Sequence, residues 1–343
     1  MAASSLTLAD FLARLAAPAS SEWSVLTGTP VLAIEATQPD EADVPADVVR
    51  RTVRVLGTLP CPSVVVIGER PSVRLQAVLD AFDVVVTTRA DLDAVVAAVT
   101  RTPFAAATLV HVLRAGATLA VDAALTLESL GYATLQAGPE HAHWLAARPA
   151  ASPVTAEDGD PVRVERERDR LVVTLDRPAR HNAFSARMRD ALCAALALAQ
   201  AEPDLPVVLR GAGPSFSSGG DLDEFGTRPD PTTAHLVRMT RSPARQLAAI
   251  APRLRAEVQG ACIGAGSELA AFAGRVSAMP DAFFQLPEVA MGLIPGAGGT
   301  ASIARRIGRQ RTAWLALTGA RIDTATALAW GLIDAVAEPA NVS

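Results

Sequence analysis

Two glutamates and two glycine-rich segments are the parts of the sequence best suited to chemistry. Glu268 begins an apolar helical run, and Glu288 lies inside an apolar stretch, where a lone carboxylate is costly to bury unless it is paired or functional. The glycine-rich segments cover residues 216–222 and 260–269. Glycines let a ligand approach the backbone closely, and free N–H groups there can polarise an oxygen anion. Two carboxylates beside such a site predict proton transfer next to a carbonyl group.

Each of these features also has a purely structural explanation. The glycines could serve only as tight turns, and Glu268 could be an ordinary acidic residue in a first helical turn, where a negative charge is favoured. The segment that starts at Gly260 does not follow the dinucleotide-binding pattern. The combination of both carboxylates with both loops is what favours acid–base chemistry on an acyl compound.

The composition excludes several other mechanisms. The chain of 343 residues contains 31 arginines and no lysine, so no lysine of this chain can form a Schiff base or hold a phosphate in a P-loop. The net charge is −5 and the arginines are spread along the chain, with Glu165 and Glu167 interleaved among those at 163–170, which argues against nucleic acid as the main partner. The three cysteines have no metal-ligand or disulfide spacing, and no apolar run approaches a membrane span. We therefore expect no metal, no membrane partner and a cytoplasmic location.

Short β-branched runs alternate with helical patterns in the C-terminal part of the chain. Ser185 is a predicted N-cap, and a long helical pattern over residues 232–250 is interrupted by Pro243. The other expected strands are 171–175, 206–209, 255–258 and 283–286, and the other expected helices begin near 186, 265 and 300. This alternation predicts an α/β fold with a mostly parallel sheet, whose carboxyl edge collects the helix N-termini.

The N-terminal part predicts a smaller α/β domain. Residues 147–161 are rich in Pro and Ala and poor in large apolar residues, so we take them as a linker between domains 1–146 and 162–343. The first sixteen residues lack a basic start and predict a short amphipathic helix rather than a signal peptide. Further strands are expected at 31–34, 64–67 and 84–86, and helices at 46–57, 91–99 and 119–136.

Residues from about 162 to 337 resemble the core of the enoyl-CoA hydratase/isomerase (crotonase) superfamily. The motifs that carry the resemblance keep a specific order and spacing: Asp176-Arg177-Pro178 with Asn182-Ala183-Phe184, residues 216–222 and 260–269, the run 284–300, Leu317-Thr318-Gly319 and residues 327–332. The resemblance implies a spiral core of ββα units. It also implies a CoA-thioester lyase that adds water to an enoyl-CoA, with coenzyme A as part of the substrate and no separate cofactor.

The resemblance assigns a role to each residue of the expected site. The backbone N–H groups of Gly220 and Ala265 would hold the thioester oxygen. Glu268 would act as base on the attacking water, and Glu288 would deliver the proton to the α-carbon, so that the addition is syn and the two titrate as a coupled pair. Family members that only shift double bonds commonly keep just the second glutamate, so the presence of both favours hydration.

The resemblance also implies where the rest of the substrate binds. Coenzyme A would lie along the loop after Arg177-Pro178, with Ala179 near the adenine and Arg180 as a candidate phosphate partner that could equally be a surface charge. Ser218 and Asp221 complete the expected substrate-binding residues, although Asp221 could also simply hold its loop. A homo-oligomer, trimer or hexamer, is expected from the resemblance.

Two departures from the family pattern stand out. The glycine triplet before the first glutamate is Gly264-Ala265-Gly266, which keeps the N–H donor but adds a methyl group. The helical C-terminal segment of the family does not follow residue 334, whereas residues 82–86, 90–99 and 123–144 resemble it. Our hypothesis is that the N-terminal part is a degenerate crotonase-like copy that covers the site of this chain or of a neighbour; the alternative is an unrelated α/β domain.

Other activities remain open at this point. An enoyl-CoA isomerase or an acyl-CoA hydrolase of the same fold would use the same framework, because residues of the acyl pocket decide between them. A catalytically silent partner subunit is the alternative of another class. The two retained glutamates argue against that alternative.

Overall fold

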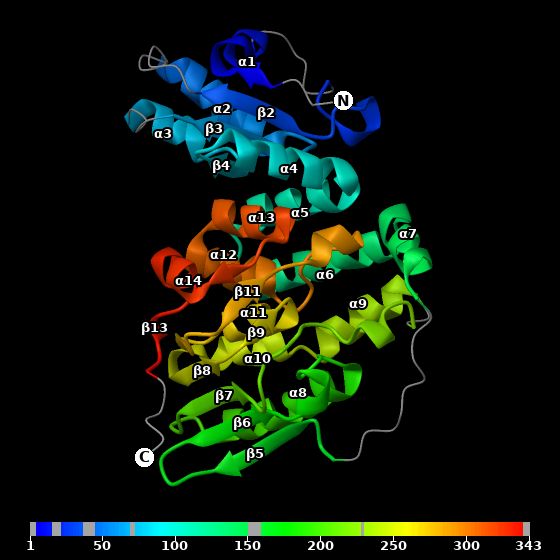
Figure 1. The fold of residues 1–343 in the computed structure, drawn as a ribbon, viewed down its shortest axis with the longest axis vertical. Helices are drawn as coiled ribbons and strands as arrows, with labels where there is room; N and C mark the ends of the chain where they lie inside the picture. The colour runs from blue at the N-terminus through cyan, green and yellow to red at the C-terminus, as the bar shows by residue number, and fades with distance from the viewer. Residues whose placement is uncertain are drawn as a thin grey trace.

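A computed structural model describes residues 5–15, 22–36, 45–68, 73–149, 159–227 and 230–338. Most of the predicted linker, residues 150–158, lies outside these ranges. Both halves of the chain combine helices with parallel strands, as Figure 1 shows, and the predicted α/β class is confirmed.

A six-stranded sheet supports the C-terminal region. Its order is β13-β10-β8-β7-β6-β5, and every neighbouring pair is parallel except β5 with β6. All five residues of β6 are buried, as expected for a β-branched strand inside a parallel sheet. The strands are β5 (Val162–Arg166), β6 (Leu171–Leu175), β7 (Val207–Gly211), β8 (Leu254–Val258), β10 (Arg275–Ala278) and β13 (Ala335–Val336).

A second, three-stranded sheet lies next to the glycine-rich segments. It has the order β12-β11-β9, in which β9 (Ala261–Ile263) and β11 (Phe283–Gln285) are parallel and β12 (Ile322–Asp323) is antiparallel. Four helices follow these strands along the chain: α11 (Ala265–Ala270), α12 (Gly299–Ile307), α13 (Arg309–Thr318) and α14 (Thr324–Trp330).

Local sequence explains the helices that precede this sheet. The Ser185 hydroxyl accepts a hydrogen bond from the N–H of Met188 and so caps α8 (Ala186–Ala201), as predicted. The pattern over 232–250 forms two helices, α9 (Pro231–Thr240) and α10 (Pro243–Ile250). Pro243 cannot donate a backbone hydrogen bond, and Ser242 caps a new helix there.

The N-terminal region contains a four-stranded parallel sheet of order β1-β2-β3-β4 and a set of helices. One of them, α5, was not predicted from the sequence: a proline at its first position starts a separate helix that is buried on most sides. The strands are β1 (Leu6–Thr7), β2 (Leu32–Ala36), β3 (Ser63–Ile67) and β4 (Val84–Val86). The helices are α1 (Leu8–Arg14), α2 (Ala46–Thr58), α3 (Val73–Leu79), α4 (Arg89–Arg101), α5 (Pro103–Gly116), α6 (Val121–Gln136) and α7 (Pro139–Ala147).

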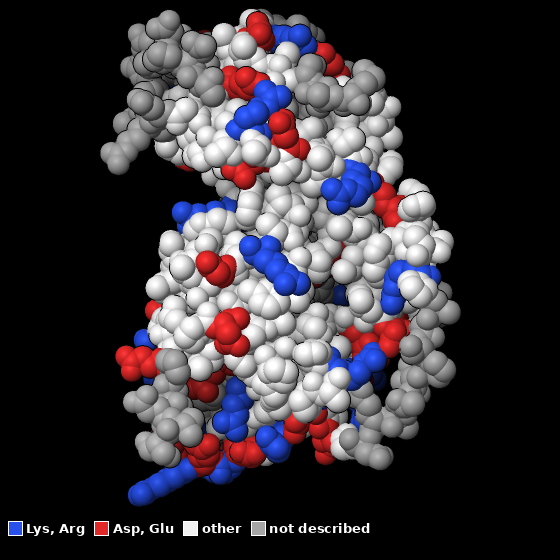
Figure 2. All heavy atoms as spheres, viewed as in Figure 1, with Lys and Arg blue, Asp and Glu red and all other residues white. Residues whose placement is uncertain are grey.

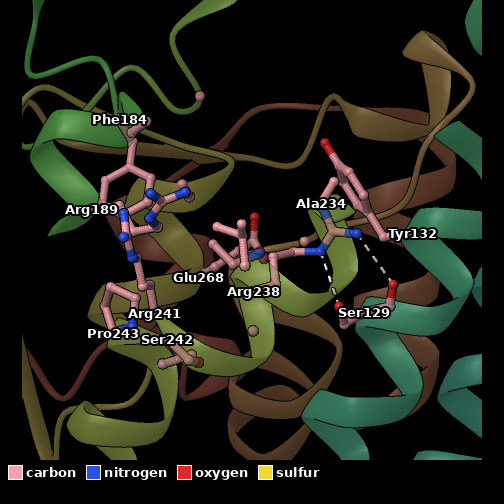
Figure 3. A pocket seen from close by; sticks show the side chains of 18 of the residues that line it. Ser129, Tyr132, Phe184, Arg189, Ala234, Arg238, Arg241, Ser242, Pro243 and Glu268 are labelled. Carbon is pink, nitrogen blue, oxygen red and sulfur yellow. Dashed lines mark hydrogen bonds between the residues drawn. The ribbon is translucent and has the colours of Figure 1, made fainter. Parts of the chain in front are cut away.

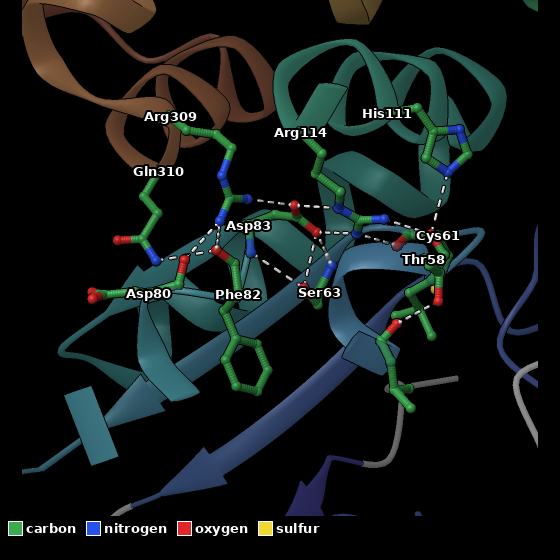
Figure 4. Close-up of polar contacts among 12 residues, drawn as sticks. Thr58, Cys61, Ser63, Asp80, Phe82, Asp83, His111, Arg114, Arg309 and Gln310 are labelled. Atoms are coloured by element: carbon green, nitrogen blue, oxygen red, sulfur yellow. Dashed lines mark hydrogen bonds and ion pairs between the residues drawn. The ribbon is translucent and has the colours of Figure 1, made fainter. Parts of the chain in front are cut away.

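The two regions share one hydrophobic core. Side chains of β4, α4 and α5 belong to the same buried cluster as those of α12 and α13. A buried ion network reinforces the contact (Figure 4): Asp83 is 1% exposed and accepts hydrogen bonds from Arg114 of α5 and from Arg309 of α13. The carboxylate also accepts from the N–H and hydroxyl of Ser63, each at 2.8 Å. The N-terminal sheet is therefore tied directly to the C-terminal region.

The distribution of charge on the surface and the length of the apolar helices bear on which partners the protein can bind. Arginines and acidic residues are interspersed over the face shown in Figure 2, with no extended patch of one sign. Within the described part of the chain, no single helix is both long and apolar enough to cross a membrane. Helices α4 and α5 reach the required length and composition together, but they meet at a bend of 110°.

Candidate active site

The first glycine-rich segment runs beside β9, and its backbone pairing orients the N–H of Gly220. Ser217 pairs with Cys262, because its N–H and its carbonyl bond to Ala261 and Ile263 at 3.0 Å. Three residues later Gly220 pairs with Phe184 through the carbonyl of Gly219 and the N–H of Asp221. In such a parallel bridge the N–H of the central residue points away from its partner. The Gly220 N–H therefore points away from Phe184.

The second glycine-rich segment turns from β9 into α11. Gly264 has a φ of +48°, which favours glycine, and its N–H donates to Gln285. Ala265 follows as the first residue of α11, so its N–H has no acceptor within the helix. A Cβ built on Gly219 would lie 3.7 Å from the Cα of Gly264, which places the two loops in contact. The two predicted oxyanion donors thus lie on adjoining loops.

Glu268 is held rigidly in the first turns of α11. Its side chain is 1% exposed, and its Oε2 accepts hydrogen bonds from the N–H groups of Ala297 at 2.7 Å and Gly299 at 2.8 Å. Burial is the main reason that the pKa of Glu268 is raised well above its usual range, and the charges of Glu288 and Glu128 act in the same direction. The amide donors favour the ionised carboxylate and oppose this shift.

Glu288 begins a short 3₁₀ helix, Glu288–Met291, and has a different environment. Its Oε2 is buried and has no hydrogen-bond partner among the described residues. Burial raises the pKa of Glu288 to about 8. A Cβ on Gly264 would lie only 2.4 Å from its Oε1, so the glycine makes room for this carboxyl group. Glu288 is thus suited to hold a proton at neutral pH.

A cavity of 230 Å³ brings the predicted residues together, and Figure 3 shows Glu268 in its wall. Gly220, Ala265, Glu288 and Asp221 also line it. Other walls come from α6 and α9. Figure 3 shows Arg238 of α9 beside Glu268, with Ser129 and Tyr132 of α6 on the other side of Arg238. The arrangement combines two carboxylates with two backbone donors. No cluster able to hold a metal occurs in the described ranges of the chain.

The remaining predicted residues lie outside this cavity. Ala179 and Arg180 are exposed on a 3₁₀ turn, and Arg180 forms ion pairs with Asp221, at 3.2 Å, and with Asp223. Asp221 also pairs with Arg177 at 3.0 Å. The N–H of Ser218 donates to the carbonyl of His181. Asp221 is therefore the residue that connects the exposed turn to the loop of Gly220.

Helices of the N-terminal region cover the cavity of this same chain. Tyr132 of α6 lies so close to Gly296 that a Cβ there would be 2.5 Å from its ring. His141 of α7 contacts the Met291 carbonyl through Nδ1 at 3.0 Å, and Trp144 packs edge-on against Phe225. Residues 123–144, one of the segments that we expected to supply a cover, lie in α6 and α7 beside the cavity, whereas their origin in a degenerate copy stays a prediction.

Sequence reasoning did not identify Glu128 as a site residue. Glu128 lies on α6, is 2% exposed and lines the cavity together with Glu268 and Glu288. Its only signal in the sequence is that it falls inside the segment 123–144, which resembles the family's helical cover.

The C-terminal region is similar in sequence to known proteins. The family model of enoyl-CoA hydratase/isomerase matches residues 165–343. Mevalonyl-coenzyme A hydratase SIDH of Beauveria bassiana is 34% identical over 173 residues, which are 48% of this chain and 62% of that protein. The 2,3-dehydroadipyl-CoA hydratase of Escherichia coli is 34% identical over 174 residues, which are 50% of this chain and 68% of that protein.

A solved structure also aligns with the chain. The crystal structure of enoyl-CoA hydratase from Thermoplasma volcanium GSS1 has 30% identity and a TM-score of 0.48, and it covers 53% of this chain and 73% of its own. The chain thus spans 62 to 68% of the length of the two curated relatives named above.

Proposed function

The chain belongs to the enoyl-CoA hydratase/isomerase family, and we propose that it catalyses the reversible syn addition of water to an enoyl-CoA. The observation that carries the proposal is the meeting of Glu268 and Glu288 in one cavity with Gly220 and Ala265. The hydratases among its relatives support the same class of reaction.

In the proposed reaction the thioester oxygen accepts from the N–H groups of Gly220 and Ala265. These donors stabilise the negative charge that develops on this oxygen as the enolate forms. Ala265 is well suited to this role because it begins a helix, where the backbone dipoles favour a negative charge.

The two glutamates divide the proton transfers. Glu268 and Glu288 share one proton, because two negative charges in one buried site repel each other, and the two amide donors favour the charge on Glu268. The ionised Glu268 removes a proton from water as the water oxygen bonds to the β-carbon. Glu288, whose raised pKa keeps it protonated, gives its proton to the α-carbon. The product leaves with the hydroxyl group of water on the β-carbon and a proton from Glu288 on the α-carbon. Transfer of the water-derived proton from Glu268 to Glu288 then restores the starting state.

The direct test is hydration of crotonyl-CoA by the purified protein. The proposal predicts that the conjugated enoyl absorbance decreases with the wild type. It also predicts that this absorbance stays constant with Glu268→Gln and with Glu288→Gln. A panel of enoyl-CoA esters would then define the acyl group. A wild-type protein that consumes none of these esters would refute the proposal.

The other activities have distinct outcomes in the same assay. An isomerase would move the double bond without forming a hydroxyacyl product, and a hydrolase would release free CoA. A silent partner subunit would neither turn over an enoyl-CoA nor bind CoA in calorimetry. The homo-oligomeric state and the cytoplasmic location stay predictions.

A further inference from the structure

Two carboxylates from different parts of the chain hold one turn, residues 297–300. Glu268 accepts from the first and third N–H groups of this turn through Oε2. Glu128 accepts from the second at 2.7 Å and from the fourth at 2.9 Å, and it also accepts from the hydroxyl of Thr300 at 2.6 Å. Four consecutive backbone donors are thus shared alternately between Glu128 and Glu268.

The turn is shaped to receive both carboxylates. Gly298 has a φ of +109°, and a Cβ on Gly299 would lie 2.6 Å from the Cγ of Glu268. The turn therefore requires glycine at its centre. Because glycine allows many backbone conformations, the glycines by themselves do not fix the conformation of the turn. The two carboxylates supply the order that its own side chains do not.

We propose that Glu128 is a positioning residue of the active site, which fixes the 297–300 turn and through it the carboxylate of Glu268. This inference rests on the proposed function. One oxygen of Glu268, Oε2, is held by the turn, whereas Oε1 has no hydrogen bond among the described residues. A fixed Oε2 sets the direction in which Oε1 meets the attacking water. The helix α6 of the N-terminal region is on this account part of the catalytic apparatus.

Glu128 also acts on the two catalytic groups by its charge. Its negative charge raises the pKa of both Glu268 and Glu288. Three hydrogen-bond donors favour its own ionised form, although burial raises its pKa to about 7. Tyr132 of α6 and Arg238 of α9 also lie near enough to interact with its charge, and His235 of α9 contacts the hydroxyl of the adjacent Ser129 at 2.9 Å.

The test is Glu128→Gln in the full-length protein. Glutamine keeps the size of the side chain but removes the charge and one acceptor oxygen. We expect kcat to fall by about 10- to 100-fold, because small displacements of a catalytic group have effects of this size, with little change in KM. The pH profile of kcat should have a rising limb, set by ionisation of Glu268, and a falling limb, set by loss of the proton of Glu288. We expect both limbs to move to lower pH, because the negative charge of Glu128 that raises the pKa of both groups is gone.

Glu140→Gln is the matched control. Glu140 holds the start of α5 by accepting from the N–H groups of Phe104 at 2.8 Å and Ala105 at 2.9 Å. Glu140→Gln therefore removes a carboxylate that accepts from two backbone N–H groups, as Glu128→Gln does, and weakens the fold in a similar way. The control is expected to lower stability without moving the pH limbs. Thr300→Val, which removes only one donor to Glu128, should move the limbs in the same direction as Glu128→Gln but less.

Two results would overturn the inference without touching the proposed function. One is a Glu128→Gln enzyme with wild-type kcat and wild-type pH limbs. The other, if that variant does not fold, is a Thr300→Val enzyme with an unchanged pH profile.

A titration of carboxyl carbon signals by NMR in glutamate-labelled protein tests the inference even without turnover. The carboxyl signals of Glu268 and Glu288 must titrate at lower pH in Glu128→Gln than in the wild type. If that variant does not fold, the same comparison is made with Thr300→Val. Unchanged titrations would count against the inference. A wild type that is inactive on every enoyl-CoA would refute the proposed function instead.

Discussion

If Glu288 delivers a proton to the substrate, hydration must slow as the pH rises through the pKa of its carboxyl group. Burial raises this pKa from 4.5 to about 8. At pH 7 a group with a pKa of about 8 is about 90% protonated, whereas an ordinary glutamate is only about 0.3% protonated. Burial therefore increases the active acid form by about 300-fold at that pH.

The assay is the pH dependence of kcat for crotonyl-CoA hydration. We expect a falling limb near pH 8, because the acid is lost as the pH rises. Glu288→Asp should move this limb to lower pH, since aspartic acid is intrinsically the stronger acid. A rate that is constant up to pH 10, or a limb close to pH 4.5, would refute the assignment of Glu288 as a buried acid.

The same pKa shift predicts an effect on folding that needs no substrate. A carboxyl group with a raised folded-state pKa contributes stability that is complete below 4.5 and is lost as the pH rises through about 8. The loss for this shift is on the order of 5 kcal/mol. Relative to Glu288→Gln, the wild type should therefore become less stable between these two pH values. Equal pH dependence of denaturant unfolding in both proteins would contradict this.

Three further substitutions test other parts of the account. Gly264→Ala should abolish most activity, because its Cβ would lie 2.4 Å from Glu288 Oε1, whereas Gly57→Ala, with open space at its Cβ, should be neutral in the same hydration assay. Asp83→Asn should lower the free energy of unfolding by about 3–5 kcal/mol, because two buried guanidinium groups lose their carboxylate; an unchanged denaturation midpoint would contradict it. Arg180→Ala should weaken CoA binding by up to about fivefold in calorimetry with kcat unchanged, and undiminished affinity would remove Arg180 as a phosphate partner.

Features set by neighbouring residues could be predicted from the sequence. The cap at Ser185 and the buried strand β6 depend on short patterns, and the structure has both. Gly220, Ala265 and Glu268 lie within the glycine-rich segments, and Glu288 lies in the run 284–300. The order of these motifs along the chain matches a known family. The cavity brings Gly220, Ala265, Glu268 and Glu288 together, and their catalytic roles stay predictions.

Features that depend on distant contacts could not be predicted. Glu128 is a site residue only because α6 folds against a turn about 170 positions later in the chain. No local pattern distinguishes it from the other acidic residues of a helix. Helix α5 was missed for a related reason: it is apolar on most sides, so it lacks the periodicity that marks a surface helix.

Turnover in water labelled with heavy oxygen and deuterium shows whether this protein adds water to an enoyl-CoA. We predict that the product of crotonyl-CoA carries heavy oxygen on the β-carbon and one deuterium on the α-carbon, both added to the same face. Both labels should be absent when Glu268→Gln replaces the wild type. Heavy oxygen in a free carboxylate, deuterium without oxygen, or no product at all would contradict the account.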